Sequence, residues 1–214
     1  MENKIIEAIE KEKLIVIVRG VAKEKLLPLA EALYNGGIRL MEVTYKADGS
    51  ENKLTSECIR MLAEAFRGRM YIGAGTVLTE EQVELTKAAG GEFIISPDAC
   101  CEVIKKTKEL AMVSMPGVMT PTEIRSAHKW GADFVKLFPA VNMGPDYIKA
   151  VKAPLSDIKY LAVGGVDLDN MKEYLDAGVC GFGIGSSIIN KKMIDAGDFE
   201  GITALARSYV ERVR

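Results

Sequence analysis

Short apolar runs alternate with longer segments of mixed character along the whole chain. Apolar runs of this length, bounded by polar residues or glycine, predict buried β-strands. Eight of them are found, at residues 14–19, 40–44, 70–73, 92–96, 111–114, 134–138, 160–163 and 181–185. The segments between them have the wider spacing of amphipathic helices, for example at residues 23–35, 51–67, 80–89 and 169–177.

Residues that commonly begin and end helices flank these segments. Thr79 precedes Glu80-Glu-Gln and Thr120 precedes Pro121-Thr-Glu, so both threonines are expected N-caps. Glycine follows several of the segments, as expected at helix C-termini. We expect residues 1–12 to form a leading helix that covers the bottom of the fold, and residues 198–213 to form a closing helix.

Repetition of strand and helix eight times favours a closed (β/α)8 TIM barrel of the α/β class, with an extra N-terminal helix. An open, doubly wound sheet is the structural alternative. The dinucleotide fingerprint of such sheets, G-x-G-x-x-G after the first strand, is absent, because the chain reads Arg19-Gly-Val-Ala-Lys there. No linker divides the sequence, so residues 1–214 are predicted to form a single barrel domain.

Composition and charge narrow the classes of function. The chain has 214 residues, 48% of them hydrophobic, and a formal net charge of −2. Balanced charge without a basic arm argues against a nucleic-acid partner. The longest apolar runs are too short to cross a bilayer, and the N-terminal residues lack the layout of a signal peptide. These features predict a cytoplasmic protein that does not bind a membrane.

Four cysteines and one histidine limit the redox and metal chemistry. Only Cys100 and Cys101 are close in sequence and no C-x-x-C spacing occurs, so free thiols are expected. With His128 as the lone histidine, a histidine-rich zinc site is nearly excluded. A magnesium site made of carboxylates is not excluded by this count.

Polar residues stand where a barrel carries its chemistry, at the carboxyl ends of its strands. Lys136 lies within the apolar run Phe134-Val-Lys-Leu-Phe138, and Glu42 lies within Leu40-Met-Glu-Val-Thr44. Apolar neighbours lower the pKa of a lysine, and a neutral amine can attack a ketone to form an iminium. A carboxylate close to that amine can move the protons of the reaction, which is the role expected of Glu42.

The same two residues also have a purely structural interpretation. Lys136 and Glu42 could form a buried ion pair, or the lysine amine could reach past the strand end into water. Glu42 could also pair with Arg19. The ion pair and the catalytic role are compatible in a resting enzyme.

Glycine-rich turns follow the last two predicted strands. Gly164 and Gly165 would expose backbone N–H groups, and Gly185-Ser186-Ser187 would begin a helix. Barrels often build a phosphate site from these two loops and a helix N-terminus. Arg19, at the end of the first strand, could complete the site with a charge-assisted hydrogen bond.

At these positions the chain resembles a known family, the 2-keto-3-deoxy-6-phosphogluconate (KDPG) and 4-hydroxy-2-oxoglutarate (KHG) aldolases. The resemblance covers nearly the entire chain. Its markers, all in the same order, are Glu42-Val-Thr44, Gly73-Ala-Gly-Thr-Val77, Ser96-Pro97, Pro116-Gly-Val-Met-Thr-Pro-Thr-Glu123, Val135-Lys-Leu-Phe-Pro139 and Gly164-Gly165.

What the resemblance implies is a class I aldolase that needs no metal and no cofactor and assembles as a homotrimer. Its substrates would be a small keto acid and an aldehyde phosphate. Lys136 matches the Schiff-base lysine of the family and Glu42 its general acid and base. Thr76 matches a residue that holds the pyruvate carboxylate. The remaining matches are Pro97 and Phe138 in the pocket wall, and Arg19, Gly164, Gly165 and Ser186 at the phosphate.

Two positions depart from the usual pattern of the family. Many members have an arginine two residues after Glu-Val-Thr that helps to bind the carboxylate, whereas this chain has Lys46, which keeps the charge without the bidentate fork. Phosphogluconate-type enzymes usually have a threonine before Gly-Gly that contacts a substrate hydroxyl. Val163 stands there instead, as in the phosphogalactonate-type enzymes, and loss of that contact can change the stereochemical preference.

Three functions are therefore open. The first is cleavage of 2-keto-3-deoxy-6-phosphogluconate, with KHG as a possible further substrate and the phosphogalactonate as the alternative. The second is a metal-dependent sugar-phosphate epimerase or isomerase, which would need several histidines at the strand ends. The third is a non-catalytic barrel that binds a phosphate ligand, with Lys136 permanently paired to Glu42.

Overall fold

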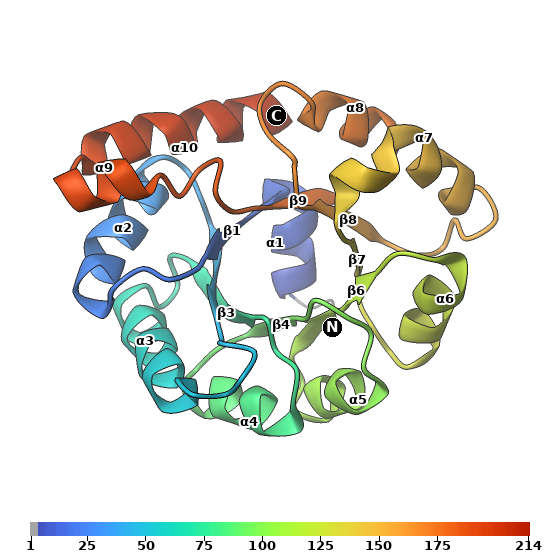
Figure 1. Ribbon diagram of the computed structural model, residues 1–214, viewed down its shortest axis with the longest axis horizontal. Coiled ribbons are helices and arrows are strands. Elements are labelled where there is room, and N and C mark those ends of the chain that lie inside the picture. Colours follow the sequence, from blue (N-terminus) through green and yellow to red (C-terminus); the bar gives the residue numbers. More distant parts are fainter. Residues whose placement is uncertain (1–3) are drawn as a thin grey trace.

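The computed structural model describes residues 4–214, and its strands form one parallel sheet. In chain order the strands are β1 (Leu14–Val18), β2 (Leu40–Thr44), β3 (Tyr71–Gly75), β4 (Phe93–Ile95), β5 (Val113–Met115), β6 (Gly117–Val118), β7 (Val135–Leu137), β8 (Tyr160–Val163) and β9 (Gly181–Ile184). Their order across the sheet is β5-β4-β3-β2-β1-β9-β8-β7-β6. A ring of helices surrounds them (Figure 1).

One helix, α1 (Lys4–Glu12), precedes β1, and the others follow the strands around the outside of this sheet. The others are α2 (Lys23–Asn35), α3 (Asn52–Ala65), α4 (Glu80–Ala88), α5 (Cys101–Glu109), α6 (Pro121–Lys129), α7 (Ala140–Lys152), α8 (Met171–Asp176), α9 (Lys191–Ala196) and α10 (Phe199–Val213). Thr79 caps α4 by accepting a hydrogen bond from Gln82 N, and Thr120 forms a capping box with Glu123 in α6. Both predicted N-caps are therefore confirmed.

The two edge strands of the sheet, β5 and β6, are halves of one strand, and this closes the barrel. Only Pro116 separates them, and proline has no N–H group for a strand ladder. The backbone carbonyl of Pro116 accepts a hydrogen bond of 2.8 Å from Lys136 N, which continues the pairing across the break. The predicted (β/α)8 barrel is confirmed, with its fifth strand broken in two.

The start of that strand was predicted wrongly. The apolar run predicts a strand from residue 111, whereas β5 begins at Val113. Ala111 has a positive φ of 53° and donates its N–H to the carbonyl of Lys108. Residues 111 and 112 therefore end the turn that follows α5, and pairing begins only after it.

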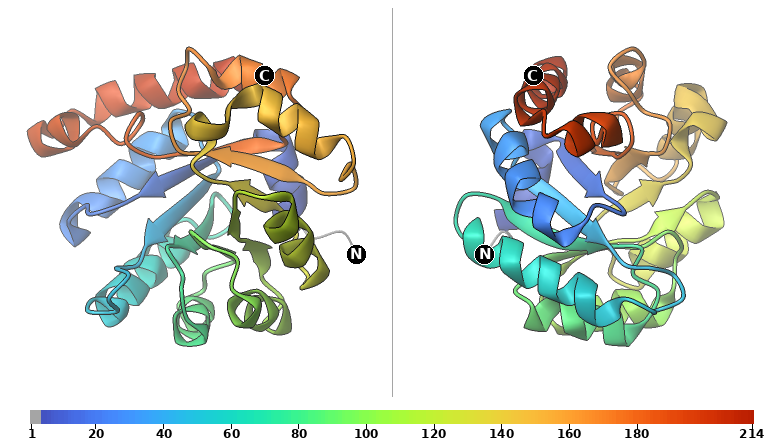
Figure 2. Two further views of the ribbon diagram at one scale, coloured as in Figure 1. Left: turned by 45° about the vertical axis from the view of Figure 1, so that its right-hand side comes forward. Right: turned by 60° about the vertical axis from the view of Figure 1, so that its left-hand side comes forward.

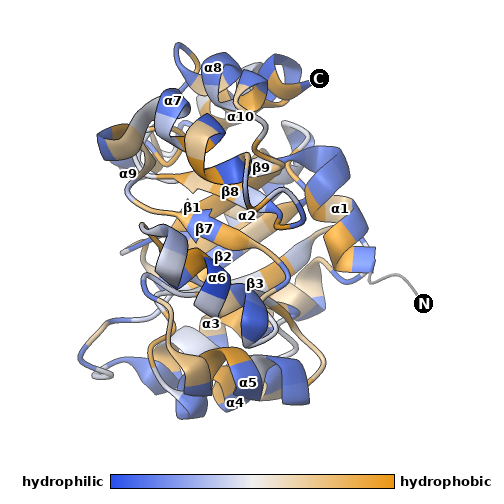
Figure 3. Cartoon of the chain, turned by 90° about the vertical axis from the view of Figure 1, so that its right-hand side faces the viewer, coloured by the Kyte–Doolittle hydropathy of each residue, from blue (hydrophilic) through white to orange (hydrophobic). Residues whose placement is uncertain are grey.

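Apolar residues form two separate cores, one on each side of the strands. The inner core fills the barrel and includes residues of α1, β1, β2, β4, β5 and β8 and the residue before β7: Ile5, Ile9, Ile15, Leu40, Phe93, Ile95, Val113, Met115, Leu161 and Phe134. The outer core lies between the strands and the surrounding helices. Figure 3 shows the strands largely in the hydrophobic colour and the outward faces of the helices in the hydrophilic one.

Helix α1 closes the bottom of the barrel, as the sequence predicts. Ile9 is fully buried and Ile5 nearly so, and both pack in the inner core. Residues 1–3 of the expected leading helix lie outside the described residues. The predicted closing helix is α10, which runs beside α2 (Figures 1 and 2). Thr203 Oγ1 donates a hydrogen bond of 3.0 Å to the carbonyl of Ala32 across that contact.

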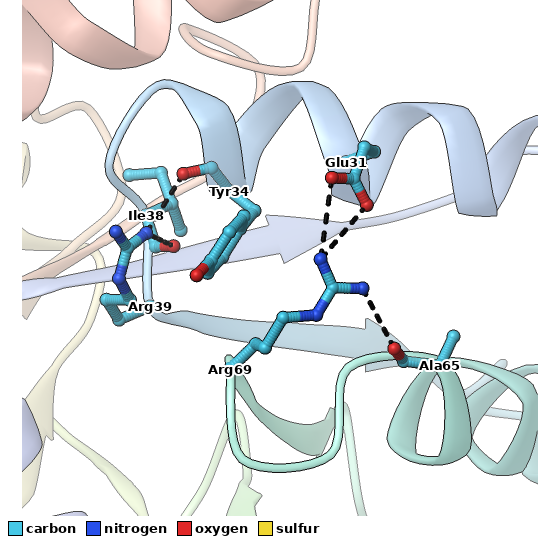
Figure 4. Close-up of polar contacts among 6 residues, drawn as sticks. All are labelled: Glu31, Tyr34, Ile38, Arg39, Ala65 and Arg69. Carbon is cyan, nitrogen blue, oxygen red and sulfur yellow. Dashed lines mark hydrogen bonds and ion pairs between the residues drawn. The ribbon is translucent and has the colours of Figure 1, made fainter.

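An aromatic and arginine cluster lies at the amino ends of β2 and β3 (Figure 4). The guanidinium groups of Arg39 and Arg69 stand over the ring of Tyr34 in α2, 4.3 and 5.1 Å from its centroid. Arg69 also stands over Phe66, at 4.6 Å, and pairs with Glu31. Cation–π contacts of this kind join α2 to the end of α3 at the bottom of the barrel.

All four cysteines are free thiols, as predicted. Within residues 4–214, no helix has the length and apolar character needed to span a membrane.

Candidate active site

Lys136 is at the centre of β7 and is buried inside the barrel, with 7% of its surface exposed. The two-residue period of the strand places it above Phe134 of the inner core. Its Nζ lies 4.7 Å from the ring centroid of Phe138. Burial lowers the pKa of the Lys136 ammonium below its ordinary value, and the charge of Glu42 opposes this in part. The amine is therefore easier to deprotonate than a surface lysine.

Glu42 is on β2 and is buried still further, with 2% of its surface exposed. Burial raises the pKa of its carboxyl to about 7, although the charges of Lys136 and Arg19 act to lower it. Its Oε2 is the buried side-chain oxygen or nitrogen that has no hydrogen-bond partner among residues 4–214. A buried polar atom without a partner is uncommon and marks a place where a bound group can complete the bonding.

Lys136 and Glu42 do not form an ion pair. Their charges influence each other, yet within the described part of the chain no carboxylate oxygen lies within 4.0 Å of Lys136 Nζ. The structural interpretation of a permanent buried pair is therefore wrong for this structure. The two groups face a common space without neutralising each other, which is the arrangement that an amine nucleophile and a separate acid and base require.

Gly75, at the end of β3, makes room for the Glu42 carboxylate. A Cβ atom at this position would lie 2.2 Å from Glu42 Oε1 and 2.5 Å from its Cδ. A Cβ at Gly73, on the same face of β3, would lie 2.3 Å from the ring of Phe93. The sequence analysis included these glycines in a motif without assigning them a role. The sequence pattern that could have indicated this role is glycine at alternate positions of a strand, because it marks the close approach of another group.

Thr76 directly follows β3 and has a positive φ of 55°, which is uncommon for a residue with a branched side chain. Its Oγ1 accepts a hydrogen bond of 2.8 Å from Nη2 of Arg19, which follows β1. Strand β2, with Glu42, lies between β1 and β3. The side chain of Arg19 therefore spans the mouth of the barrel over the end of β2.

The loop after β4 packs against the start of β6. Pro97 follows β4, and a Cβ at Gly117, the first residue of β6, would lie 2.1 Å from the Pro97 carbonyl oxygen, so this close contact requires glycine. Asp98 is a further residue that the sequence analysis did not single out. Its charge raises the pKa of Lys136, which indicates that it lies near the amine.

A hollow of about 540 Å³ opens at the carboxyl ends of β1, β7, β8 and β9. Its lining brings together six of the expected residues: Arg19, Phe138, Val163, Gly164, Gly165 and Ser186. Gly164 and Gly165 both have positive φ, 91° and 77°, which glycine adopts without strain. Ser187 Oγ donates to the carbonyl of Val166 and joins the last two loops.

The expected helix at Ser186 is not there. The N–H groups of Ile188 and Ile189 both bond to the carbonyl of Gly185, so the chain makes a single turn. Helix α9 begins only at Lys191, with Asn190 as its N-cap. A two-residue polar signal cannot distinguish one turn from the first turn of a helix, and this explains the error.

A second hollow, of about 750 Å³, shares Ile17, Arg19, Gly185 and Ser186 with the first. Its other lining residues include Lys191 and Lys192. The Lys191 ammonium lies 3.9 Å from the place where a Cβ of Gly20 would be, next to Arg19. No carboxylate lies within 4.0 Å of it among the residues that the structure describes, so its charge is free to attract an anion.

Lys46 is the one expected residue that lies apart from the others. It hydrogen-bonds and pairs with Glu51, and 55% of its side chain is exposed. The bond to Glu51 raises the pKa of Lys46. Together with Glu51 it lines a groove with residues of α2 and α3, outside the barrel mouth. A further hollow, of about 640 Å³, lies at the opposite end of the barrel and contains none of the expected site residues.

The fold and the site define the class of the protein. A closed (β/α)8 barrel that buries a lysine and a glutamate in its interior, without an ion pair between them or to another of residues 4–214, and that opens into hollows at the carboxyl ends of its strands has the design of a barrel enzyme. The chain belongs to the KDPG and KHG aldolase family, whose profile matches residues 5–205. It is an aldolase, and so a carbon–carbon lyase.

Curated relatives agree with this family over almost the full chain. The chain is 34% identical to the 2-dehydro-3-deoxy-6-phosphogalactonate aldolase of Escherichia coli K12, covering 94% of this chain and 96% of the relative. It is 31% identical to the 2-dehydro-3-deoxy-phosphogluconate aldolase of Haemophilus influenzae, covering 99% and 98%. Curated relatives of both substrate types therefore match the chain, at 34% and 31% identity.

Solved structures show the same relationship. The KDPG aldolase of Legionella pneumophila, with pyruvate captured as a covalent carbinolamine intermediate, is 30% identical with a TM-score of 0.85, covering 95% of this chain and 97% of that one. A native KDPGal structure is 34% identical with a TM-score of 0.82, covering 94% and 95%. A cube-shaped cage designed by fusing symmetric oligomeric domains is 33% identical with a TM-score of 0.85, covering 95% and 73%.

Proposed function

We propose that this aldolase cleaves a 2-keto-3-deoxy-6-phospho sugar acid to pyruvate and glyceraldehyde 3-phosphate through a Schiff base on Lys136. The observation that carries the proposal is the pair of buried groups, Lys136 and Glu42, which face one space without forming an ion pair. The Legionella relative, which captures pyruvate covalently, supports the same chemistry.

The reaction would begin with attack of the neutral Lys136 amine on the C2 ketone, followed by loss of water to give an iminium. Glu42 in its ionised form removes the proton of the C4 hydroxyl. The C3–C4 bond then breaks, its electron pair moves to the iminium nitrogen, and the aldehyde leaves. Protonation of the resulting enamine at C3 by Glu42, and hydrolysis, release pyruvate and free the lysine.

The remaining residues would each bind a different part of the substrate. Thr76 holds the keto-acid carboxylate, and Pro97, Phe138 and Val163 form the wall. Gly164, Gly165 and Ser186 bind the phosphate of the aldehyde, with Arg19 placed between the two ends of the substrate. No step needs a metal ion or a cofactor. The enzyme acts on these small molecules in the cytoplasm.

Val163 supports the phosphogalactonate as a second candidate substrate. Its side chain is buried at the end of β8. Its Cγ2 atom lies 2.8 Å from the place where a Cβ of Gly183 would be. A valine there offers no hydroxyl to the substrate, so both C4 configurations remain compatible with the site. KHG, which lacks a phosphate, is a further candidate, because a KHG/KDPG aldolase of Escherichia coli is 32% identical over 199 residues.

We also propose that the protein assembles as a homotrimer. Three large apolar side chains at the rim of the mouth are exposed, Met119, Phe138 and Val141. The N–H of Phe138 bonds to Val118, and Val141 donates its N–H to the carbonyl of Gly164, so the three lie on one side of the mouth. Exposed apolar side chains grouped in this way are typical of a subunit interface.

Borohydride reduction in the presence of pyruvate tests the catalytic proposal. We expect a stable adduct on the peptide that contains Lys136, identified by mass spectrometry, and none in Lys136→Ala. Lys152→Ala is the matched control, since that lysine bonds to the carbonyl of Gly178, away from the mouth, and should leave the adduct unchanged. Absence of an adduct in the folded wild-type protein would overturn the proposal and favour a non-catalytic binding barrel.

A further inference from the structure

The hollow of about 640 Å³ at the amino ends of β3 and β4 is not used by the proposed reaction. The end of α3, the turn after α4 and the start of α1 surround it. Its volume lies within the roughly 300–1,000 Å³ of pockets that hold small molecules. It shares no lining residue with the hollows at the barrel mouth, so a ligand bound here would stay clear of the active site.

Cations gather at this hollow. Lys4, Arg60 and Arg67 are exposed, and no carboxylate oxygen among residues 4–214 lies within 4.0 Å of their charged nitrogen atoms. A fourth cation, Arg69, is held in place by Glu31 of α2 (Figure 4). Like charges around one hollow repel one another, and an anion placed among them relieves that repulsion.

Compensation of helix dipoles does not account for these cations. A cation is stabilising at a helix C-terminus, yet the last turn of α3 contains no basic residue, because Arg60 precedes that turn and Arg67 follows the helix. Lys4 is at the start of α1, where the helix dipole disfavours a positive charge. The three charges therefore have the hollow in common rather than a helix end.

The floor of the hollow is apolar. Ala63, Met70 and Ala89 contribute to its lining, and the last two of these are buried. The half-buried ring of Tyr71 adds an aromatic face, and its hydroxyl has no hydrogen-bond partner within the part of the chain that the structure describes. Such a floor can pack against a flat ring system.

Two carboxyl groups complete the lining. Glu92 precedes β4 and is half-buried, and this burial raises the pKa of its carboxyl although the charge of Lys87 opposes the shift. Neither Glu92 nor Glu64 has an ion-pair partner within 4.0 Å among residues 4–214. Carboxylates accept hydrogen bonds and repel a ligand made of phosphate alone. The lining therefore suits a ligand that carries negative charge, a ring and hydrogen-bond donors together.

We infer that this hollow binds a mononucleotide, with its phosphates against Lys4, Arg60 and Arg67 and its base on the apolar floor beside Tyr71. The Glu92 carboxylate accepts hydrogen bonds from the amino and hydroxyl groups of the nucleoside. The inference does not depend on the proposed reaction. It adds a second ligand site, at the opposite end of the barrel from the first.

Calorimetric titration with ADP in the absence of divalent cations tests this site, and pyrophosphate is the comparison because it has the same diphosphate and no ring. We expect wild type to bind ADP saturably, with a dissociation constant about tenfold or more below that for pyrophosphate, as for stacking of one base. Bound ADP should also raise the melting temperature.

Charge reversals at the hollow show where ADP binds. Arg60→Glu and Arg67→Glu should each raise the dissociation constant for ADP about 10- to 100-fold, through loss of a charge-assisted contact. Arg207→Glu makes the same change of net charge on the exposed face of α10 and should stay within about twofold. Both arginines of the hollow are exposed, so melts without ADP should show the variants folded.

The phosphate turns at the barrel mouth are the competing site for ADP. Arg19→Met removes the cation of the mouth and should leave the dissociation constant within about twofold. Loss of binding in Arg19→Met, with binding kept in Arg60→Glu and Arg67→Glu, would place ADP at the mouth and overturn the inference. Absence of saturable ADP binding to wild type, or equal dissociation constants for ADP and pyrophosphate, would overturn it as well.

Discussion

The Glu42 carboxyl is buried, and this burial determines the pH at which the group loses its proton. Burial raises the pKa to about 7, so the group changes charge in the pH range where the enzyme would work. Such a carboxyl can both accept and return a proton without a large free-energy cost, which suits a residue that serves as base and then as acid.

Exchange of the methyl protons of pyruvate with deuterated solvent measures this property directly. Exchange requires ionised Glu42, so we expect its rate to fall about tenfold per pH unit below pH 7 and to level off above it. Glu42→Gln should lower the rate by about 10²- to 10⁴-fold and remove this pH dependence. The rate is followed by proton NMR. A limb near pH 4.5, or full exchange in the variant, would contradict the assignment.

The stability of the folded protein should depend on the same titration of Glu42. Whereas the exchange rate rises with pH, the stability should fall. The folded protein holds the Glu42 proton more tightly than the unfolded chain does. The stability gained in this way is complete below about pH 4.5 and is lost as pH rises through about 7. Thermal melts should therefore show Glu42→Gln gaining stability relative to wild type between pH 5 and about 8. A constant difference over that range would be evidence against the raised pKa.

Gly75 gives a steric test of the same carboxylate. Gly75→Ala would put a methyl group 2.2 Å from Glu42 Oε1, so the carboxylate must move. We expect kcat to fall by about 10²-fold or more, because displacement of a reacting group by about 1 Å has that effect. Gly73→Ala is the matched control on the same strand face. It meets the Phe93 ring, so it should lower the melting temperature while the folded fraction keeps its kcat. Unchanged kcat in Gly75→Ala would contradict this role.

At the scale of elements, the apolar runs predicted the eight strands of the barrel, but the fifth was predicted with the wrong start and without its break into β5 and β6. The ends of most strands lie within two residues of the prediction because burial on both faces leaves a continuous apolar signal. The strand expected at 111–114 began late and broke at Pro116, since a left-handed residue and a missing N–H act on hydrogen bonding and leave hydropathy unchanged. The helix starts predicted from the caps Thr79 and Thr120 were found, whereas the start predicted after β9 was a polar turn.

The candidate site was predictable where it depends on strand register. Lys136 and Glu42 face inward because their strands alternate, and the turns after β8 and β9 meet because parallel strands end together. The bond between Arg19 and Thr76 was not predictable, because it depends on how a long side chain crosses an intervening strand. The position of Lys46 was missed for a similar reason, since Glu51 captures it locally.

Helix α1 is predicted to support the barrel without taking part in its chemistry. Ile9 is fully buried in the inner core, so Ile9→Ala should lower the free energy of unfolding by about 2–5 kcal/mol. Chemical denaturation measures this change. Glu7→Ala, on the exposed face of the same helix, should stay within about 0.5 kcal/mol. Steady-state constants of both variants should match wild type where they are folded, and a loss of kcat in Ile9→Ala alone would show that α1 also positions the site.

The whole molecule separates stability from chemistry along the barrel axis. Helix α1, which covers the bottom of the barrel, and the cluster of Arg39, Arg69 and Tyr34 lie at the amino ends of the strands. The two adjoining hollows lie at the carboxyl ends, and the buried amine and the buried carboxylate lie inside the barrel on the middle residues of β7 and β2. This division is typical of (β/α)8 enzymes, in which loops at one end can vary while the other end maintains the fold.

The proposed trimer is also tested at this scale. Sedimentation analysis should give three times the 23.3 kDa of one chain. Val141→Asp puts a charge on the exposed apolar rim and should yield a smaller species. Leu54→Asp is the control, since Leu54 is equally apolar and exposed but lies on α3. A wild-type monomer, or dissociation caused by Leu54→Asp instead, would contradict the proposed interface.

The contact between Gly75 and Glu42 has an evolutionary consequence. A side chain at position 75 would displace the carboxylate, so we expect a lineage that keeps Glu42 to keep glycine there as well. A descendant that replaces the glutamate by a small residue releases position 75 to drift. Among distant barrels of this ancestry, we therefore expect glycine at this position wherever the carboxylate is retained, and larger residues only where it has been lost.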